Sequence, residues 1–402
     1  MIKNILIVTD CFLPNFAPRM GALASNLEKL GYNVTVIAED NGETHYTLPN
    51  CPAKVFRYNY QANISKIKYY IKTSINLIFD HKSLSFYKKF SSVIKTGEFD
   101  LVLCSTFNEF PLNLSYKIAK KLNVPLVCDV RDVIEQFDGI NYSHKAFKDN
   151  AFNRFFASLL REKRIRKRNS ILSKASAITT VSPWHKDFLS KLNSNVHLIY
   201  NGYSSEVFVP RKTKSSSFNI IYTGRILDSN TEPIELLFKA IEELKLSDIK
   251  ICWYTDEKSK QTIEKATVKY PYCQEITEIN NLVSITEIPS LLEQSSLVLV
   301  LTNKSGKNGP KGIMTTKFFE AVGMEKPVLC VRSDEGCLAK VIEQTNAGVA
   351  AKSTEEVKNF ILEKYAEWQK NGFTWQNVGN KEYFCRESQA KEFVEIFKTL
   401  VK

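Results

Sequence analysis

The residues of this sequence best suited to chemistry stand at the start of a short amphipathic segment, residues 315–322. Two threonines, Thr315 and Thr316, are followed directly by Lys317, and Glu320 lies one turn later if the segment is a helix. A helix entry exposes free backbone N–H groups and the positive end of the helix dipole, so an anion is favoured beside the Lys317 ammonium. Glu320 could accept hydrogen bonds from ribose hydroxyls. We therefore expect Thr316, Lys317 and Glu320 to hold a nucleotide diphosphate.

Further candidates follow predicted strands. Gly224 and Arg225 come directly after the apolar run 219–223, where a guanidinium is suited to stabilising an anionic leaving group. Gly21 would start the helix predicted over 18–30 and would let the backbone approach a diphosphate or an acceptor closely, or it only eases helix packing. The neighbouring Arg19 is a candidate for substrate contact.

The turn Asp129-Val130-Arg131-Asp132 follows the strand predicted over 125–128. In this position Arg131 could bind an anion and Asp132 could bind sugar hydroxyls. The alternative is an internal Asp–Arg pair that only fixes the loop, and the sequence does not choose between the two. His185, the most suggestive of the five histidines, follows a predicted strand; it either lines the cleft or, as we prefer, is an incidental helix residue.

The elements that must position these residues form two series. Strand patterns alternate with helix patterns, which is typical of parallel sheets with crossover helices. The first series has strands predicted at 5–9, 34–38, 101–105, 125–130, 177–181 and 197–200, and the second at 219–223, 250–254, 297–302 and 328–331. We predict an α/β protein with two Rossmann-like doubly wound domains, 1–205 and 206–380, facing across a cleft. The polar stretch 210–217 is expected to be a linker, and 381–401 a last helix.

Four short motifs, in order along the chain, resemble those of the retaining glycosyltransferases of glycosyltransferase family 4. They are Asp129–Asp132, Asn201–Tyr203, Ile221–Gly224, and the segment Thr316–Glu320 with Lys326-Pro327-Val328 after it. The resemblance, to bacterial surface-polysaccharide members, implies the GT-B fold. It also implies that the last segment, 381–402, crosses back onto the first domain.

The resemblance further implies function. It implies that a sugar moves from a nucleotide-diphosphate donor, UDP- or GDP-linked, to a hydroxyl of a surface polysaccharide or a polyprenyl-diphosphate-linked oligosaccharide. The resemblance also implies that no metal or resident cofactor is needed, and the sequence has no Asp-x-Asp triplet. The protein must mainly supply positive charge to the leaving diphosphate. Arg225, Lys317 and Asp132 are then the candidate catalytic residues, Gly21 and Gly224 would face the donor, and Arg19 and Arg131 would contact substrate.

The sequence departs from the family pattern in two places. Many members carry a lysine about five residues after the arginine that corresponds to Arg225, and this chain has none there. Gly312 stands where the first of a pair of glutamates is expected, eight residues before Glu320. The basic, glycine-rich loop 303–312 takes its place, and it either closes over the donor or is a surface loop without a role.

Composition limits the remaining choices. The net charge of +12 among 402 residues favours an anionic partner. Two basic stretches, 66–90 with interleaved aromatics and 161–168, suggest contact with an anionic membrane surface, or else are solvated helix faces. No nucleic-acid motif surrounds them. Nine scattered cysteines indicate a reducing compartment, and the start of the chain has no signal-peptide pattern, so we expect a cytoplasmic protein, peripheral at most at the inner face of the membrane.

Two other functions remain open. A sugar-nucleotide epimerase would share the fold but would need acidic and histidine groups for proton transfer, which the sequence does not place together. A non-catalytic relative of the same fold, acting as a membrane-binding or partner-binding subunit, would explain the two departures. Nucleotide binding that depends on Lys317 distinguishes these possibilities.

Overall fold

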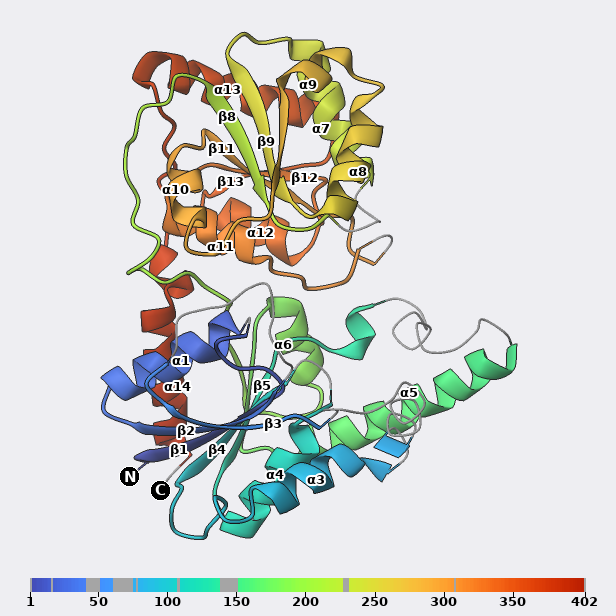
Figure 1. Cartoon of the computed structure of the whole chain (residues 1–402), viewed down its shortest axis with the longest axis vertical. Helices are drawn as coiled ribbons and strands as arrows, with labels where there is room; N and C mark the ends of the chain where they lie inside the picture. The colour runs from blue at the N-terminus through green and yellow to red at the C-terminus, as the bar shows by residue number, and fades with distance from the viewer. Residues whose placement is uncertain are drawn as a thin grey trace. The chain divides into compact units, whose positions relative to one another are not determined.

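The structure is a computed structural model that describes residues 2–15, 17–40, 51–60, 75–76, 79–106, 109–137, 151–226, 231–306 and 309–400. The chain forms two compact units. Unit 1 comprises Met1–Tyr200 and Gln389–Lys402, and unit 2 comprises Asn201–Ser388. In each unit a sheet lies between helices, and both ends of the chain belong to unit 1 (Figure 1).

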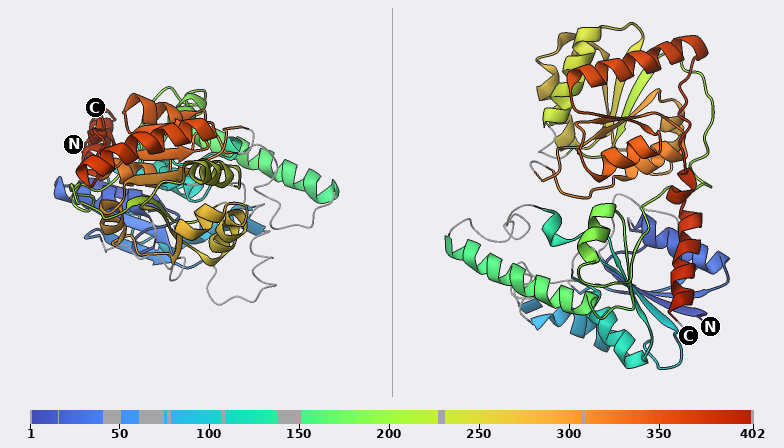
Figure 2. Two further views of the ribbon diagram at one scale, coloured as in Figure 1. Left: turned by 90° about the horizontal axis from the view of Figure 1, so that it is seen from above. Right: turned by 180° about the vertical axis from the view of Figure 1, so that it is seen from behind.

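Unit 1 is built on a seven-stranded parallel sheet with the order β3-β2-β1-β4-β5-β6-β7. Its strands are β1 Asn4–Thr9, β2 Asn33–Glu39, β3 Lys54–Tyr58, β4 Leu101–Thr106, β5 Leu126–Val130, β6 Ala177–Thr180 and β7 Val196–Leu198. Its helices are α1 Pro18–Lys29, α3 His81–Lys89, α4 Leu112–Leu122, the 3₁₀ turn η1 Ile134–Gln136, α5 Ala151–Leu172, α6 Pro183–Leu189 and most of α14 Arg386–Thr399. Helix α5 runs out beyond the sheet of this unit (Figure 2).

The period of two in a strand gives unit 1 a core on each face of its sheet. Along β1, Leu6 and Val8 belong to one buried cluster, while Ile5 and Ile7 belong to another that also contains Phe393 of α14. Because both faces are covered, the strand is apolar throughout instead of alternating with polar residues. The last helix is therefore part of the core of unit 1.

Unit 2 has a six-stranded parallel sheet with the order β10-β9-β8-β11-β12-β13. Its strands are β8 Phe218–Thr223, β9 Ile249–Thr255, β10 Thr277–Asn281, β11 Leu297–Leu301, β12 Val328–Val331 and β13 Gly348–Ala351. Its helices are α7 Thr231–Leu244, α8 Glu257–Thr267, α9 Pro271–Ile276, α10 Ile288–Glu293, α11 Thr316–Gly323, α12 Cys337–Gln344, α13 Thr354–Asn371 and the 3₁₀ turn η4 Lys381–Phe384. The prediction of two doubly wound parallel-sheet units is confirmed.

The structure differs from the sequence prediction where hydrogen bonds between distant residues determine the backbone conformation. The continuous helix expected over 381–401 is interrupted at Cys385, which has an extended backbone. The Tyr203 N–H donates to the Phe384 carbonyl at 2.9 Å, and the Tyr203 carbonyl accepts the Arg386 N–H at 3.0 Å. The backbone around Cys385 therefore bonds to a distant part of the same chain and not within a helix. The stretch 210–217, expected to be a linker, lies within unit 2.

Candidate functional site

The parallel strands of unit 1 end in a group of charged side chains, with Asp129 in β5 at its centre. Its carboxylate is fully buried and accepts hydrogen bonds from Arg19 Nη2 at 2.8 Å and Thr179 Oγ1 at 2.7 Å. Arg19 also donates to the Tyr200 carbonyl at 2.6 Å. Burial opposes ionisation of Asp129, but the Arg19 charge and these hydrogen bonds outweigh it, so the pKa of the carboxyl is lowered. The pair is an internal brace between β5 and α1.

Arg131 and Gly21 also make contacts inside unit 1. Arg131 Nη2 lies 2.8 Å from Asp10 Oδ1 at the end of β1, and about a fifth of each side chain is exposed. A Cβ placed on Gly21 would come within 2.5 Å of Leu13 Cδ1, so this glycine makes room for a neighbouring side chain. The structure thus shows a packing contact for Gly21, while its approach to a diphosphate or an acceptor stays a prediction.

Asp132 is joined to a buried polar chain that the sequence did not reveal. Gln136 Nε2 donates to Asp132 Oδ1 at 2.6 Å, and Gln136 Oε1 lies 2.6 Å from His185 Nε2. On its other side His185 Nδ1 lies 2.6 Å from Ser182 Oγ, the N-cap of α6. Burial raises the pKa of Asp132 to about 6 and lowers that of His185 to about 4. His185 is therefore a member of a network and not an incidental helix residue.

In unit 2 the predicted diphosphate residues come together. Gly224, directly after β8, has φ +103, and a Cβ there would lie 3.2 Å from Lys317 Nζ at the start of α11. Lys317 Nζ also lies 4.9 Å from the centroid of the Tyr222 ring. Thr315 is the N-cap of α11, but its side chain makes no capping hydrogen bond. The free donors of Thr316 and the following residues thus remain at the helix entry.

The charges at this helix entry are incompletely balanced. Burial lowers the pKa of Lys317, and the Glu320 carboxylate opposes that shift. Burial raises the pKa of Glu320, against the charges of Lys317 and Arg386. No ion pair of Lys317 is found among the described residues. A desolvated lysine without an ion-pair partner at an uncapped helix entry is suited to receive an anion.

Arg225 lies on the same loop as Gly224 but points elsewhere. Its Nε is 3.2 Å from Asp256 Oδ2, with 62% of the arginine side chain exposed. An exposed ion pair of this kind contributes little to stability, so the guanidinium is available to another anion at small cost.

Two other segments singled out in the sequence make contacts within unit 2. Lys326 is buried, and its Nζ donates to the carbonyls of Glu293 at 2.9 Å and Ser295 at 3.0 Å, at the C-terminal end of α10. In the loop after β11, Lys304 pairs with Glu335 at 3.1 Å, and Ser305 N donates to the Asp334 carbonyl at 3.0 Å. The described part of this loop is thus anchored to the loop after β12.

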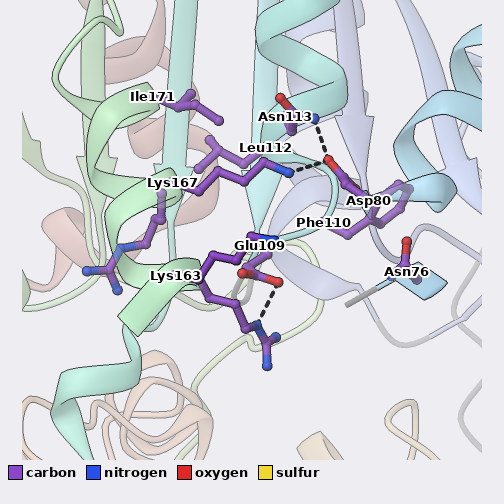
Figure 3. A pocket seen from close by; sticks show the side chains of 11 residues that line it. Asn76, Asp80, Glu109, Phe110, Leu112, Asn113, Lys163, Lys167 and Ile171 are labelled. Atoms are coloured by element: carbon purple, nitrogen blue, oxygen red, sulfur yellow. Dashed lines mark hydrogen bonds and ion pairs between the residues drawn. The ribbon is translucent and has the colours of Figure 1, made fainter. Parts of the chain in front are cut away.

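A separate hollow in unit 1, of about 60 Å³, lies beside α5 (Figure 3). Asp80 accepts from Lys167 Nζ at 2.6 Å and from Asn113, and Arg164 Nε lies 2.7 Å from Glu109 Oε2. Arg164 and Lys167 belong to the basic stretch 161–168, which was predicted either to contact a membrane surface or to be a solvated helix face. Lys167 and Arg164 are paired with carboxylates of the same unit, so these two contribute less free positive charge than the sequence suggested, while membrane contact of the stretch stays a prediction.

The other predicted basic and aromatic stretch, 66–90, is only partly described. Residues 66–72 lie outside the described residues, while Phe86 in α3 and the following Phe90 are buried in the core of unit 1. Their interpretation as interfacial aromatics was wrong, because they pack against the sheet. Within the described residues, no helix is long and apolar enough to cross a membrane, and no cluster of histidine, cysteine and acidic side chains has the arrangement of a metal site.

Comparison with known proteins agrees with this architecture. The model of Glycosyltransferase Family 4 matches residues 19–207, while none of the curated proteins compared matches the chain. Sucrose-phosphate synthase from Thermosynechococcus elongatus has a similar structure, with a TM-score of 0.64, 14% identity and 99% of each chain covered. HepE from Anabaena, solved with UDP and glucose, also has a TM-score of 0.64 and 14% identity, covering 99% of this chain and 100% of HepE.

An enzyme of another class is similar as well. A putative UDP-N-acetylglucosamine 2-epimerase from Listeria monocytogenes has a TM-score of 0.56 and 11% identity, covering 99% of this chain and 96% of its own. Likenesses at such low identity establish the fold alone. The resemblance to Glycosyltransferase Family 4 is therefore confirmed for residues 19–207, and the whole chain has the GT-B fold of the glycosyltransferases to which it is similar.

Proposed function

We propose that the protein is a retaining glycosyltransferase whose unit 2 binds a nucleotide-diphosphate sugar, UDP- or GDP-linked. The observation that carries the proposal is the contact between Gly224 and Lys317, where a Cβ on the glycine would lie 3.2 Å from the lysine Nζ. The Lys317 ammonium is thus desolvated and lies beside the uncapped N-terminal end of α11. HepE, solved with UDP, is consistent with a uridine nucleotide.

The charges at this site suit departure of a nucleoside diphosphate. As the bond between the sugar and the diphosphate breaks, negative charge grows on the leaving oxygen, and preorganised donors stabilise that charge. Lys317 and the N–H groups of α11 supply them, and Arg225 adds a cation once it leaves Asp256. The departing diphosphate accepts the proton of the acceptor hydroxyl, so no strong protein base is needed. The proposal therefore requires neither a metal nor a resident cofactor.

We propose that unit 1 binds the acceptor, a hydroxyl of a surface polysaccharide or of a polyprenyl-diphosphate-linked oligosaccharide. Asp132 would accept a hydrogen bond from another hydroxyl of the acceptor sugar, since the reacting hydroxyl gives its proton to the diphosphate, and Arg131 would contact an anionic group of the acceptor. Two large apolar side chains of α5, Phe155 and Leu159, are 64% and 52% exposed. They support peripheral contact with the inner face of a membrane, where a lipid-linked acceptor would lie.

The test is calorimetric titration of UDP, GDP, ADP and CMP into the wild type and Lys317→Ala. We expect one nucleotide to bind the wild type and to bind the variant at least about 30-fold more weakly, because a hydrogen bond between charged groups contributes about 2–3 kcal/mol. The thermal midpoint of the free variant should not fall, since the removed ammonium is desolvated and makes no ion pair within the described residues.

The matched control is Lys370→Ala, an exposed lysine in the last turn of α13, which should bind the nucleotide as the wild type does. Loss of affinity in both variants would indicate a general charge effect. No binding of any nucleotide to the wild type would favour the non-catalytic alternative.

An epimerase is the second candidate because of the similar putative epimerase from Listeria monocytogenes. Proton transfer at a sugar carbon needs a group with a free basic or acidic position. Both ring nitrogens of His185 are engaged in hydrogen bonds, which argues against that role. Incubation of UDP-N-acetylglucosamine with the protein in D₂O would decide: deuterium incorporation into the sugar supports the epimerase, and its absence removes that candidate.

A further inference from the structure

The buried hydrogen-bond network behind Asp132 has a defined order of donors and acceptors. Gln136 Oε1 accepts the Val133 N–H at 3.1 Å, which fixes the orientation of the amide because only its oxygen can accept. His185 Nε2, 2.6 Å from the same oxygen, must then carry a hydrogen and donate it. In the neutral ring Nδ1 is left as the acceptor for the Ser182 hydroxyl at 2.6 Å. The side-chain hydrogen bonds of this network therefore all donate in the direction from Ser182 toward Asp132.

This direction leaves a single possible role for the Gln136 amide nitrogen. It donates to Asp132 Oδ1 at 2.6 Å. Gln136, His185 and Ser182 are 1%, 0% and 0% exposed, so no solvent competes for their hydrogen bonds. Within the part of the chain that the structure describes, no partner of Asp132 Oδ2 is found. The carboxylate therefore has one oxygen fixed from inside the protein and one oxygen left to accept.

We infer that Gln136 and His185 are positioning residues, which hold Asp132 so that its Oδ2 accepts a hydrogen bond from a hydroxyl of a bound pyranoside. This inference rests on the proposed function, in which unit 1 binds the sugar of the acceptor. A buried network of this kind restricts the carboxylate to one orientation, and fixing a group in its productive geometry is what such supporting residues supply. Asp129, by contrast, accepts on both oxygens: Oδ1 from Arg19 and Thr179, and Oδ2 from Arg19 Nε at 3.1 Å and Ser105 Oγ at 3.3 Å.

The experiment measures pyranoside and nucleotide binding separately. Methyl α-D-glucopyranoside and methyl α-D-galactopyranoside are titrated by saturation-transfer NMR into the full-length wild type, Asp132→Asn and Gln136→Glu. Glutamate at 136 keeps an acceptor for Val133 and His185 but removes the donor to Asp132. We expect at least about tenfold weaker pyranoside binding in both variants, with unchanged nucleotide affinity measured by calorimetry.

Two variants of His185, the next residue of the network, distinguish positioning of Asp132 from packing. His185→Gln retains a side-chain N–H for Gln136, whereas His185→Leu does not. We expect the first to bind pyranoside within about threefold of the wild type and the second to bind as weakly as Gln136→Glu. Asp187→Asn, an exposed carboxylate on the same helix, is the matched control and should bind normally.

The outcomes separate this inference from the proposed function. Pyranoside binding that survives in Asp132→Asn and Gln136→Glu overturns the inference, and so does a wild type that binds neither pyranoside. The proposed function is judged independently by nucleotide binding to unit 2. If His185→Gln weakens binding as much as His185→Leu at equal thermal midpoints, the network does not position Asp132.

Discussion

At the residue scale, unit 1 separates two aspartates that lie three positions apart. Asp129 points into the protein and is neutralised by Arg19, whereas Asp132 has an oxygen without a protein partner in the described structure. The structure shows an ion pair for Asp129, formed with Arg19 outside the motif, while sugar binding by Asp132 stays a proposal. A buried ion pair braces the fold, and a carboxylate with a free oxygen is available for binding.

The brace makes a prediction about stability. Asp129→Asn should lower the free energy of unfolding by about 3–5 kcal/mol at pH 7, because Arg19 would remain buried without its counter-charge. The pKa of Asp129 is lowered from 3.8. An aspartate with a lowered pKa in the folded state stabilises above its unfolded pKa, and this contribution disappears as the pH falls below about 3.8 through the folded pKa.

Urea unfolding followed by circular dichroism measures this effect. The difference between the wild type and Asp129→Asn should be constant from pH 7 to about 5 and should shrink below about pH 4. Asp187→Asn, which changes an exposed carboxylate, should unfold like the wild type. A difference below about 1 kcal/mol at pH 7 would mean that the pair is not a brace.

At the scale of elements, the sequence pattern was sufficient to predict a helix where its buried face follows the helical period. The helix predicted at 315–322 is α11, Thr316–Gly323, because its apolar residues Phe318, Phe319 and Val322 form one buried face. The pattern could not reveal Gln136 and His185 as partners, since they are 49 positions apart and meet only through the parallel pairing of β5 and β6. Buried polar networks depend on tertiary structure, which periodicity does not encode.

Helix α12 gives a prediction at the same scale. Asp334, two residues before its N-cap, accepts backbone N–H groups from Leu338 at 3.1 Å and Ala339 at 2.8 Å. Asp334→Ala should cost about 1–2 kcal/mol in chemical unfolding, because these helix-entry donors would lose their acceptor. Asp334→Asn keeps an acceptor oxygen and should cost clearly less. Equal losses in the two variants would show that the capping hydrogen bonds are not the cause.

At the scale of the whole molecule, the two ends of the chain share a core. Phe397 of α14 is fully buried in the cluster that contains Ile5 of β1 and Val36 of β2. The sequence pattern predicted a last helix over 381–401. Only the family resemblance indicated which domain it would cover. Strands β1 and β2 therefore depend on packing against α14, which is far from them in the sequence.

Phe397→Ala tests this dependence. Removing a buried phenylalanine should cost about 3–5 kcal/mol. The loss should appear as faster amide hydrogen exchange in β1 and β2, while β8 and β9 of unit 2 exchange as in the wild type. Phe79→Ala, at a side chain that is 75% exposed, is the control and should leave exchange unchanged in both sheets. Faster exchange in β8 and β9 to the same degree would mean that the units unfold as one, whereas unchanged β1 and β2 would mean that α14 does not support the first sheet.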